Sequence, residues 1–367
     1  MSFQPGRMGT AEGIGLIFVI TFAKIFLSTP ARAAEISAGL SWLSPLVAAA
    51  ATFLPVLLLN FVFKWIPGDL YSITRKLCGR WGAVLIALFY IGIFLSDAAL
   101  LLRQFAENTL LTALPDAEFS LVITVYGLIV GVLVYLGIEA IARSSYLLMP
   151  FIVGSMLLIF LMLSPLYNLY NLAPWLGNGL GTTVKAGMLT AGINIGAIVA
   201  IVMASSFQNY RNLNACLVFG LGSSALIKSV FFVIYVMVFG VAVAQEKTLP
   251  FFETARLVYL SRYLQRIEAV FILLWVIVGI ISIAISVYIG LYLISRLLKL
   301  PTMAPLIPVV MLILIELAMI PDDITTTINL DYELLSTYYN GGIYVFPVLL
   351  FVMAYLKKRK HNKAAVA

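Results

Sequence analysis

The sequence predicts an all-α integral membrane protein of ten transmembrane helices, arranged as two inverted five-helix repeats in which helices 1 and 6 are broken. Three observations lead to this prediction. Of the 367 residues, 62% are hydrophobic and 11% are charged, against roughly 45–50% and 25% in soluble domains. Apolar runs long enough to cross a bilayer recur along the whole chain. Two of these runs are interrupted by residues that weaken a helix.

The apolar segments fill the chain and leave no polar stretch long enough for a second, soluble domain. We place them at residues 11–40 (broken), 45–65, 81–107, 119–137, 144–164, 185–206, 212–242, 264–297, 302–320 and 338–357. The first repeat covers about 11–164, the second about 185–357, and residues 358–367 form a basic tail. An odd number of helices in each repeat inverts the second relative to the first. The N-terminal segment lacks the order of a signal peptide, so we expect helix 1 to remain in the mature chain.

Charged residues between the segments predict which side of the membrane each loop faces. The side that holds both termini is basic, with Lys64, Arg75, Lys76, Arg80, Arg143, Arg211, Arg296, Lys299, Lys357, Lys358, Arg359, Lys360 and Lys363. The opposite side is acidic, with Glu107, Asp116, Glu118, Asp322, Asp323, Asp331 and Glu333 in its loops. Both termini are therefore predicted to be cytoplasmic. The loop after helix 7 is an exception, and we expect a short interfacial helix there to pair Arg256, Arg262 and Arg266 with Glu246, Glu253 and Glu268.

The first interruption lies between Thr21 and Pro30. At ~1.5 Å per residue, Lys24 is ~20 Å from the start of its apolar run and hence close to mid-bilayer. Pro30 removes a backbone donor, and Ser28 and Thr29 can cap the groups that a break sets free. A broken first helix with polar groups at the break is how many secondary transporters form a binding site. The alternative is a proline-kinked helix with Lys24 snorkelling to an interface.

The second interruption is the stretch from Gly192 to Gly196, which contains Asn194. Glycine weakens a helix interior by ~1 kcal/mol, and an asparagine side chain offers both donors and acceptors. If the halves are repeats, this segment is the counterpart of the first break. The alternative is a face of small residues that lets two membrane helices approach closely.

Asp97 lies in the middle of helix 3 and needs a partner at that depth. We predict that it faces the same cavity as Lys24, paired directly or through a ligand; the alternative is a purely structural ion pair. Ser282 and Ser286 share one face of helix 8 and either contact a ligand or bond to their own backbone. Lys228 and Glu316 are also intramembrane charges, to which we assign no ligand contact.

Residue types argue against enzymatic chemistry. The one histidine, His361, is in the basic tail, so histidine catalysis and histidine metal sites in the membrane are not expected. Cys78 and Cys216 fall at predicted cytoplasmic helix ends and should be free thiols. No phosphate-binding loop, zinc-protease motif or nucleophile elbow is present. We expect no enzyme activity, no cofactor and no metal, and the net charge of +7 reflects loop sidedness rather than nucleic-acid binding.

Several short motifs, in this order along a ten-helix chain, are similar to one known family. They are Leu77–Trp81, residues 137–143, Leu172–Leu180 (LAPWLGNGL), Gln265–Glu268 followed by Trp275, and Pro321–Asp323. The chain resembles the spore germination permeases, the B subunits of nutrient germinant receptors. That family belongs to the amino acid/polyamine/organocation transporter superfamily, and the resemblance covers nearly the whole length.

The resemblance implies a LeuT-like fold with a small-molecule pocket at the broken helices and amino acids as the commonest ligand class. It also implies an A subunit and a lipoprotein C subunit as partners in the spore inner membrane. By position, the ligand-binding residues would be Lys24, Ile25, Asp97, Asn194, Ile195 and Ser282.

The chain departs from the family at both breaks. Residues 23–26 lack the glycines that usually expose backbone at the first break, and no acidic residue follows the second. Charged side chains, Lys24 and Asp97, stand there instead. This is compatible with an unusual ligand, or with a pocket filled by its own ion pair.

Two functions remain after this comparison. A receptor would bind a ligand and signal by a shift in conformation. A secondary transporter would couple uptake to H⁺ or Na⁺, with Asp97, Lys24 and Ser286 as the candidate coupling groups. Both use the same fold, so the fold does not separate them.

Overall fold

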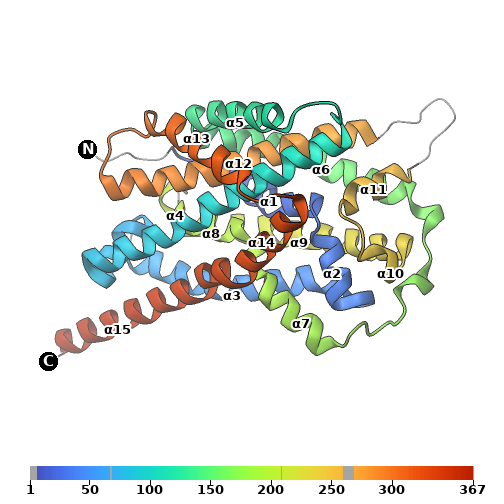
Figure 1. The fold of residues 1–367 in the computed structure, drawn as a ribbon. Helices are drawn as coiled ribbons and strands as arrows, with labels where there is room; N and C mark the ends of the chain where they lie inside the picture. The colour runs from blue at the N-terminus through green and yellow to red at the C-terminus, as the bar shows by residue number, and fades with distance from the viewer. Residues whose placement is uncertain (1–5, 67, 208, 259–267, 367) are drawn as a thin grey trace.

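The computed structural model describes residues 6–66, 68–207, 209–258 and 268–366, which fold into helices joined by short connections (Figure 1). The first half contains α1 (Thr10–Phe22), η1 (Ala23–Phe26), α2 (Thr29–Ser37), η2 (Ala38–Leu40), α3 (Leu43–Trp65), α4 (Leu70–Thr112), α5 (Phe119–Leu136) and α6 (Ile138–Met162). The second half contains η3 (Ser164–Leu166), η4 (Leu169–Leu172), α7 (Leu180–Leu189), η5 (Thr190–Ile193), α8 (Ile195–Val202), η6 (Ala204–Ser206), α9 (Tyr210–Phe239), α10 (Val241–Ala244), α11 (Pro250–Arg256), α12 (Glu268–Leu298), α13 (Leu306–Met319), α14 (Ile324–Leu334), η7 (Leu335–Tyr339), η8 (Gly341–Val345) and α15 (Phe346–Val366).

The number of long apolar helices shows that this is a multi-pass membrane protein. Within the described ranges, 7 helical spans are long and apolar enough to cross a bilayer, or 9 if each of two bent helix pairs counts as one span. Helix α13 is a shorter apolar helix. Helices α5 and α13 lie on the outside of the bundle (Figure 1) and expose large apolar side chains such as Leu128 and Leu312, as a lipid-facing helix does.

Helix α1 lies inside the bundle because it is apolar all round. Its buried residues run without a gap from Gly15 to Phe22, and it packs against α6, α8, α9 and α12. Helix α4 packs along the length of α12. The start of α1 and the end of α15 lie at the left end of the bundle in Figure 1, whereas α2, α10 and α11 lie at the opposite end.

The chain bends sharply at two places inside this core. The helical segments Thr10–Phe26 and Thr29–Leu40 meet at 69°, and the segments Leu180–Ile193 and Ile195–Val202 meet at 44°. At the first bend, Pro30 lies in the first turn of α2, and Thr29 donates a side-chain hydrogen bond of 2.8 Å to the carbonyl of Lys24. The capping role predicted for Thr29 is therefore confirmed, whereas Ser28 makes no side-chain cap bond.

Two predicted loops are wrong in part, because they are helical. Helix α4 begins at Leu70 rather than near residue 81, and Gly79 interrupts it with a φ of 76°. Helix α14 begins at Ile324, where the sequence suggested a loop up to residue 337. Asp323 caps α14 by accepting a hydrogen bond of 2.6 Å from the Thr326 N–H. Asp331 is therefore a buried helical residue and does not belong to an acidic outer loop.

The loop after the predicted helix 7 contains the short helix α11, and Lys247 pairs with Glu253 there at 2.6 Å. Arg262, Arg266 and most of the motif Gln265–Glu268 lie outside the described residues.

Candidate functional site

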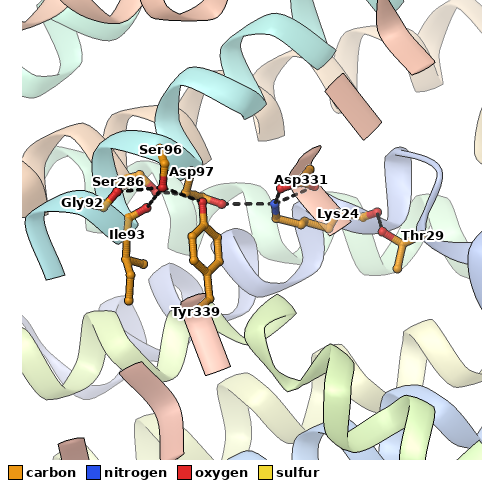
Figure 2. Close-up of polar contacts among 9 residues, drawn as sticks. All are labelled: Lys24, Thr29, Gly92, Ile93, Ser96, Asp97, Ser286, Asp331 and Tyr339. Carbon is orange, nitrogen blue, oxygen red and sulfur yellow. Dashed lines mark hydrogen bonds and ion pairs between the residues drawn. The ribbon is translucent and has the colours of Figure 1, made fainter. Parts of the chain in front are cut away.

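Lys24 is the centre of a buried charge cluster at the first bend (Figure 2). Its side chain is 1% exposed. The ammonium Nζ lies 2.8 Å and 3.1 Å from the two carboxylate oxygens of Asp331, and 3.2 Å from Oδ1 of Asp97. The chain thus brings together the predicted Lys24–Asp97 pair and adds a second carboxylate. A buried ammonium needs such partners, because an unpaired charge in a low-dielectric interior is strongly unfavourable.

Three helices far apart in the sequence supply this cluster. Lys24 lies in η1, the last helical turn before the first bend, while Asp97 comes from α4 and Asp331 from α14. Asp97 is fully buried, and its Oδ2 accepts a hydrogen bond of 2.7 Å from Ser286 of α12. The cluster therefore connects the residue before the first bend to α4, α12 and α14.

A second chain of polar groups lies beside Asp97 (Figure 2). The hydroxyls of Ser96 and Tyr339 are 2.9 Å apart. Ser96 also donates to the carbonyls of Gly92 and Ile93, at 2.7 Å and 3.0 Å. Tyr339 is buried and belongs to η7, which follows α14 directly. This chain fixes the position of α14, and hence that of Asp331, relative to α4.

The second bend is held by neutral groups. The Asn340 side chain accepts a hydrogen bond of 2.9 Å from the Gly192 N–H and donates to the Leu189 carbonyl at 2.6 Å. Asn194 donates to Thr52 of α3 at 3.0 Å. A Cβ atom on Gly192 would collide with the carbonyl oxygen of Leu335.

Gly196 is equally close to a neighbour, since a Cβ atom there would collide with the Thr21 side chain and lie 2.9 Å from the carbonyl oxygen of Ile17. Both glycines therefore allow close helix packing, which was the alternative interpretation of this stretch. The chain also bends at the same place. The stretch from Gly192 to Gly196 therefore both allows close helix packing and contains a bend.

A cavity lies next to the charge cluster, between α2, α3, α7, α9 and α14. It offers about 60 Å³ of space, room for roughly four to six waters or a small organic molecule. Its lining residues include Ser28, Thr29, Arg32, Ser37, Asn194, Lys228, Phe232, Asn329, Asp331 and Tyr332. Asp331 belongs to both the cavity and the cluster, so a molecule in the cavity lies beside the carboxylate that binds Lys24.

The structure distributes the predicted ligand residues as follows. Asn194 lines the cavity. Lys24 and Asp97 lie behind Asp331 in the buried cluster, and Ile25 and Ile195 are buried apolar residues of η1 and α8. Ser282 donates to the Val278 carbonyl of its own helix at 2.8 Å. Ser286, predicted as a coupling group, bonds Asp97.

Sequence reasoning missed two residues of this region, Asp331 and Lys228. Asp331 was assigned to a loop, whereas in the structure Thr327 and Asp331, four residues apart, are both buried on one face of α14. Lys228 was noticed as a deep charge but given no role. It is 3% exposed and lines the cavity.

Comparison with known proteins identifies the family. The sequence model of a family described as "Spore germination protein" matches residues 7–327. The chain belongs to this family. The resemblance to spore germination permeases that the sequence motifs suggested is therefore confirmed.

Two curated relatives match this spore germination protein over almost its whole length. Spore germination protein KB of Bacillus subtilis (strain 168) is 24% identical over 371 residues, which cover 98% of this chain and 98% of that protein. Spore germination protein YndE of the same organism is 23% identical over 374 residues, which cover 97% of this chain and 99% of that protein.

Two solved transporters have a similar fold. Mhp1, a nucleobase-cation-symport-1 family transporter in a closed conformation with bromovinylhydantoin bound, matches with a TM-score of 0.65 at 16% identity, over 97% of this chain and 92% of Mhp1. A mutant manganese transporter of Eremococcus coleocola matches with a TM-score of 0.61 at 12% identity, over 96% and 80%. At these identities the likeness shows a shared LeuT-like transporter fold and nothing about what this chain binds.

Proposed function

We propose that this protein is the membrane subunit of a nutrient germinant receptor, which binds a small molecule in the cavity beside Asp331 and triggers spore germination. Its family and the names of both relatives support germination as the process. The cavity supports small-molecule binding, because it is concave, mostly apolar and adjoins a few convergent polar groups. By resemblance, amino acids are the first ligand class to test, and A and C subunits in the spore inner membrane are the partners.

The proposed architecture has ten spans in two inverted five-helix repeats, about 11–164 and 185–357. The two bent pairs are then helices 1 and 6, and α13 is helix 9. With both termini cytoplasmic, α2, α7 and α14 lie in the outer half of the membrane. The cavity between them would then receive its ligand from the side opposite the cytoplasm.

The observation that favours a receptor over a cation-coupled transporter is the position of Lys24. Its ammonium lies between Asp97 and Asp331, the place where a coupling cation would be neutralised. A symporter must release its coupling cation on the far side of the membrane, whereas a lysine is tethered to the chain. A lysine fixed between Asp97 and Asp331 therefore favours ligand binding without ion-coupled transport.

An H⁺- or Na⁺-coupled transporter is the second candidate, and the similarity in fold to two transporters supports it. Ligand uptake would then be coupled to protonation and deprotonation of Asp97 or Lys24, because burial can move the pKa of a group into the range where it titrates. Ser286, which bonds Asp97, would belong to the same site.

The test begins with thermal unfolding of the purified protein in detergent against amino acids, nucleosides and sugars. A ligand at ~100 times its dissociation constant stabilises by ~2.7 kcal/mol, a measurable shift in Tm. The ligand found is then offered to proteoliposomes and to spores that lack the gene. A receptor binds it without uptake driven by a proton or sodium gradient, and the mutant spores fail to germinate on it. Gradient-driven uptake with normal germination would instead identify a transporter.

A further inference from the structure

Lys228 is a deeply buried lysine, 3% exposed. It lies in α9, and its Nζ donates a hydrogen bond of 3.2 Å to the Thr21 carbonyl, close to the first bend. Within the described parts of the chain, no carboxylate lies within 4.0 Å of this ammonium, whereas Lys24 has two. The Thr21 carbonyl needs only a hydrogen-bond donor, and a neutral side chain such as serine or glutamine could also donate to it. The hydrogen bond to Thr21 therefore does not by itself account for a lysine at this position.

Two other side chains of this cavity have polar atoms without a hydrogen-bond partner in the described part of the chain. Ser37 is fully buried, and its hydroxyl has no hydrogen-bond partner among the described residues. The Nε–H of Arg32 is buried and likewise unpaired there, although Nη1 of Arg32 pairs with Glu35 at 2.7 Å. Both residues line the cavity together with Lys228. Buried polar groups are almost always hydrogen-bonded, so a group of donors around one cavity indicates an acceptor that fills it.

The acidic residue of the cavity does not supply this acceptor. Asp331 directs both of its carboxylate oxygens to Lys24, at 2.8 Å and 3.1 Å. Glu35 is engaged by Arg32. The cavity is therefore lined by donors that no carboxylate of the described residues contacts, the arrangement that a bound carboxylate satisfies.

We propose that the cavity binds a small carboxylate and that the ammonium of Lys228 holds its anionic oxygens. The hydroxyl of Ser37 and the Nε–H of Arg32 complete the set of donors. The space of about 60 Å³ admits only a compact acid in this conformation. This inference rests on the proposal that the cavity is the ligand site, and it assigns the carboxylate to a side chain of α9 rather than to backbone groups of the bends.

The test uses pairs of probes of similar size and shape in which a neutral amide replaces the carboxylate: propionate against propionamide, and L-alanine against L-alaninamide. Thermal unfolding of the full-length protein in detergent gives an apparent affinity for each probe. We expect at least one acid to bind tenfold or more tightly than its amide, and Lys228→Gln to remove that preference. Lys185→Gln, which changes an exposed lysine of α7 outside the cavity, should leave it intact.

Several results overturn the proposal. Equal binding of an acid and its amide does so, and so does unchanged acid binding by Lys228→Gln. A panel in which no probe shifts Tm at concentrations up to the solubility limit also contradicts it. If Lys228→Gln does not fold, Lys228→Arg replaces it: the arginine variant keeps the charge and must keep the preference for the acid within tenfold.

The receptor role and the carboxylate site fail in different ways. If acids bind in a Lys228-dependent manner but spores lacking the gene germinate normally on them, the receptor role fails and the carboxylate site stands. If spores need the gene to respond to a neutral germinant, and Lys228→Gln spores respond like the wild type, the carboxylate site fails and the receptor role stands.

Discussion

The two bends of the core are stabilised by opposite means. At the first, which turns by 69°, Lys24 is held by two buried carboxylates from α4 and α14. At the second, which turns by 44°, Gly192 and Asn194 are held by neutral hydrogen bonds and close packing. Charges can be altered by a proton or a nearby ligand, whereas packed backbone cannot. We therefore expect the first bend to respond to binding and the second to act as a fixed frame.

Lys24→Met tests the charged bend and should have the largest effect. It leaves Asp97 and Asp331 buried without their cation, and breaking a buried ion pair by removing one partner destabilises by about 3–5 kcal/mol. Thermal unfolding in detergent should therefore show a large fall in Tm. Because the pair is shielded from solvent, added salt should change the difference very little.

The matched control removes the stranded charges as well. Lys24→Met combined with Asp97→Asn should recover part of the lost stability, and adding Asp331→Asn should recover more, because both carboxylates bind the same ammonium. If the triple variant is no more stable than Lys24→Met, the three charges do not act as a unit and the comparison between the two bends fails.

Lys24 and Asp97 could be found from the sequence, because each lies deep inside a long apolar run and a charge there needs a partner. The interruptions at Pro30 and at Gly192–Gly196 were visible for a similar reason, since proline and glycine weaken a helix wherever they occur. These features depend on local sequence and on the thickness of a bilayer. The helical fold was accessible on the same grounds, whereas the family was suggested by the resemblance of short motifs such as Leu172–Leu180.

Asp331 could not be placed in this way. Threonines and an asparagine surround it between Ile324 and Leu334, and these residue types have low helix propensity, so the segment resembles a loop. Its helix is stabilised by the Asp323 cap and by packing against α4. The cavity was likewise inaccessible, since it depends on how five separate helices approach one another. Lys228 had a visible depth, but its distance from the carboxylates of the described residues is a property of the fold.

Gly192→Ala tests the neutral bend and should have an intermediate effect. The new methyl group would meet the backbone of Leu335, the first residue of η7, which directly follows the helix that carries Asp331 and cannot move freely. Overpacking of this kind destabilises by about 1–3 kcal/mol.

Gly222→Ala in α9 is the control, because nothing lies within 4 Å of the added carbon. Alanine favours a helix over glycine by up to about 1 kcal/mol, so this variant should be neutral or slightly more stable. Equal losses of Tm in Gly192→Ala and Gly222→Ala would show that the second bend is not tightly packed and is no more rigid than the first.

Asp323→Ala should have the smallest effect and tests whether the charged bend depends on the start of α14. The Thr326 backbone N–H bonded to the exposed Asp323 carboxylate holds the pKa of this group below its ordinary value of 3.8. A lowered pKa in the folded state stabilises the protein above the unfolded-state pKa, and that contribution is lost as pH falls through the folded-state pKa. The difference in Tm between wild type and Asp323→Ala should thus be constant from pH 7 to about pH 5 and shrink below about pH 4.

The link to the first bend is tested by the same substitution in the Lys24→Met background. Because α14 positions Asp331 beside Lys24, Asp323→Ala should lower the Tm of the Lys24→Met protein by less than it lowers the Tm of the wild type. Equal losses in both backgrounds would mean that the cap stabilises only its own helix and that the first bend is independent of it.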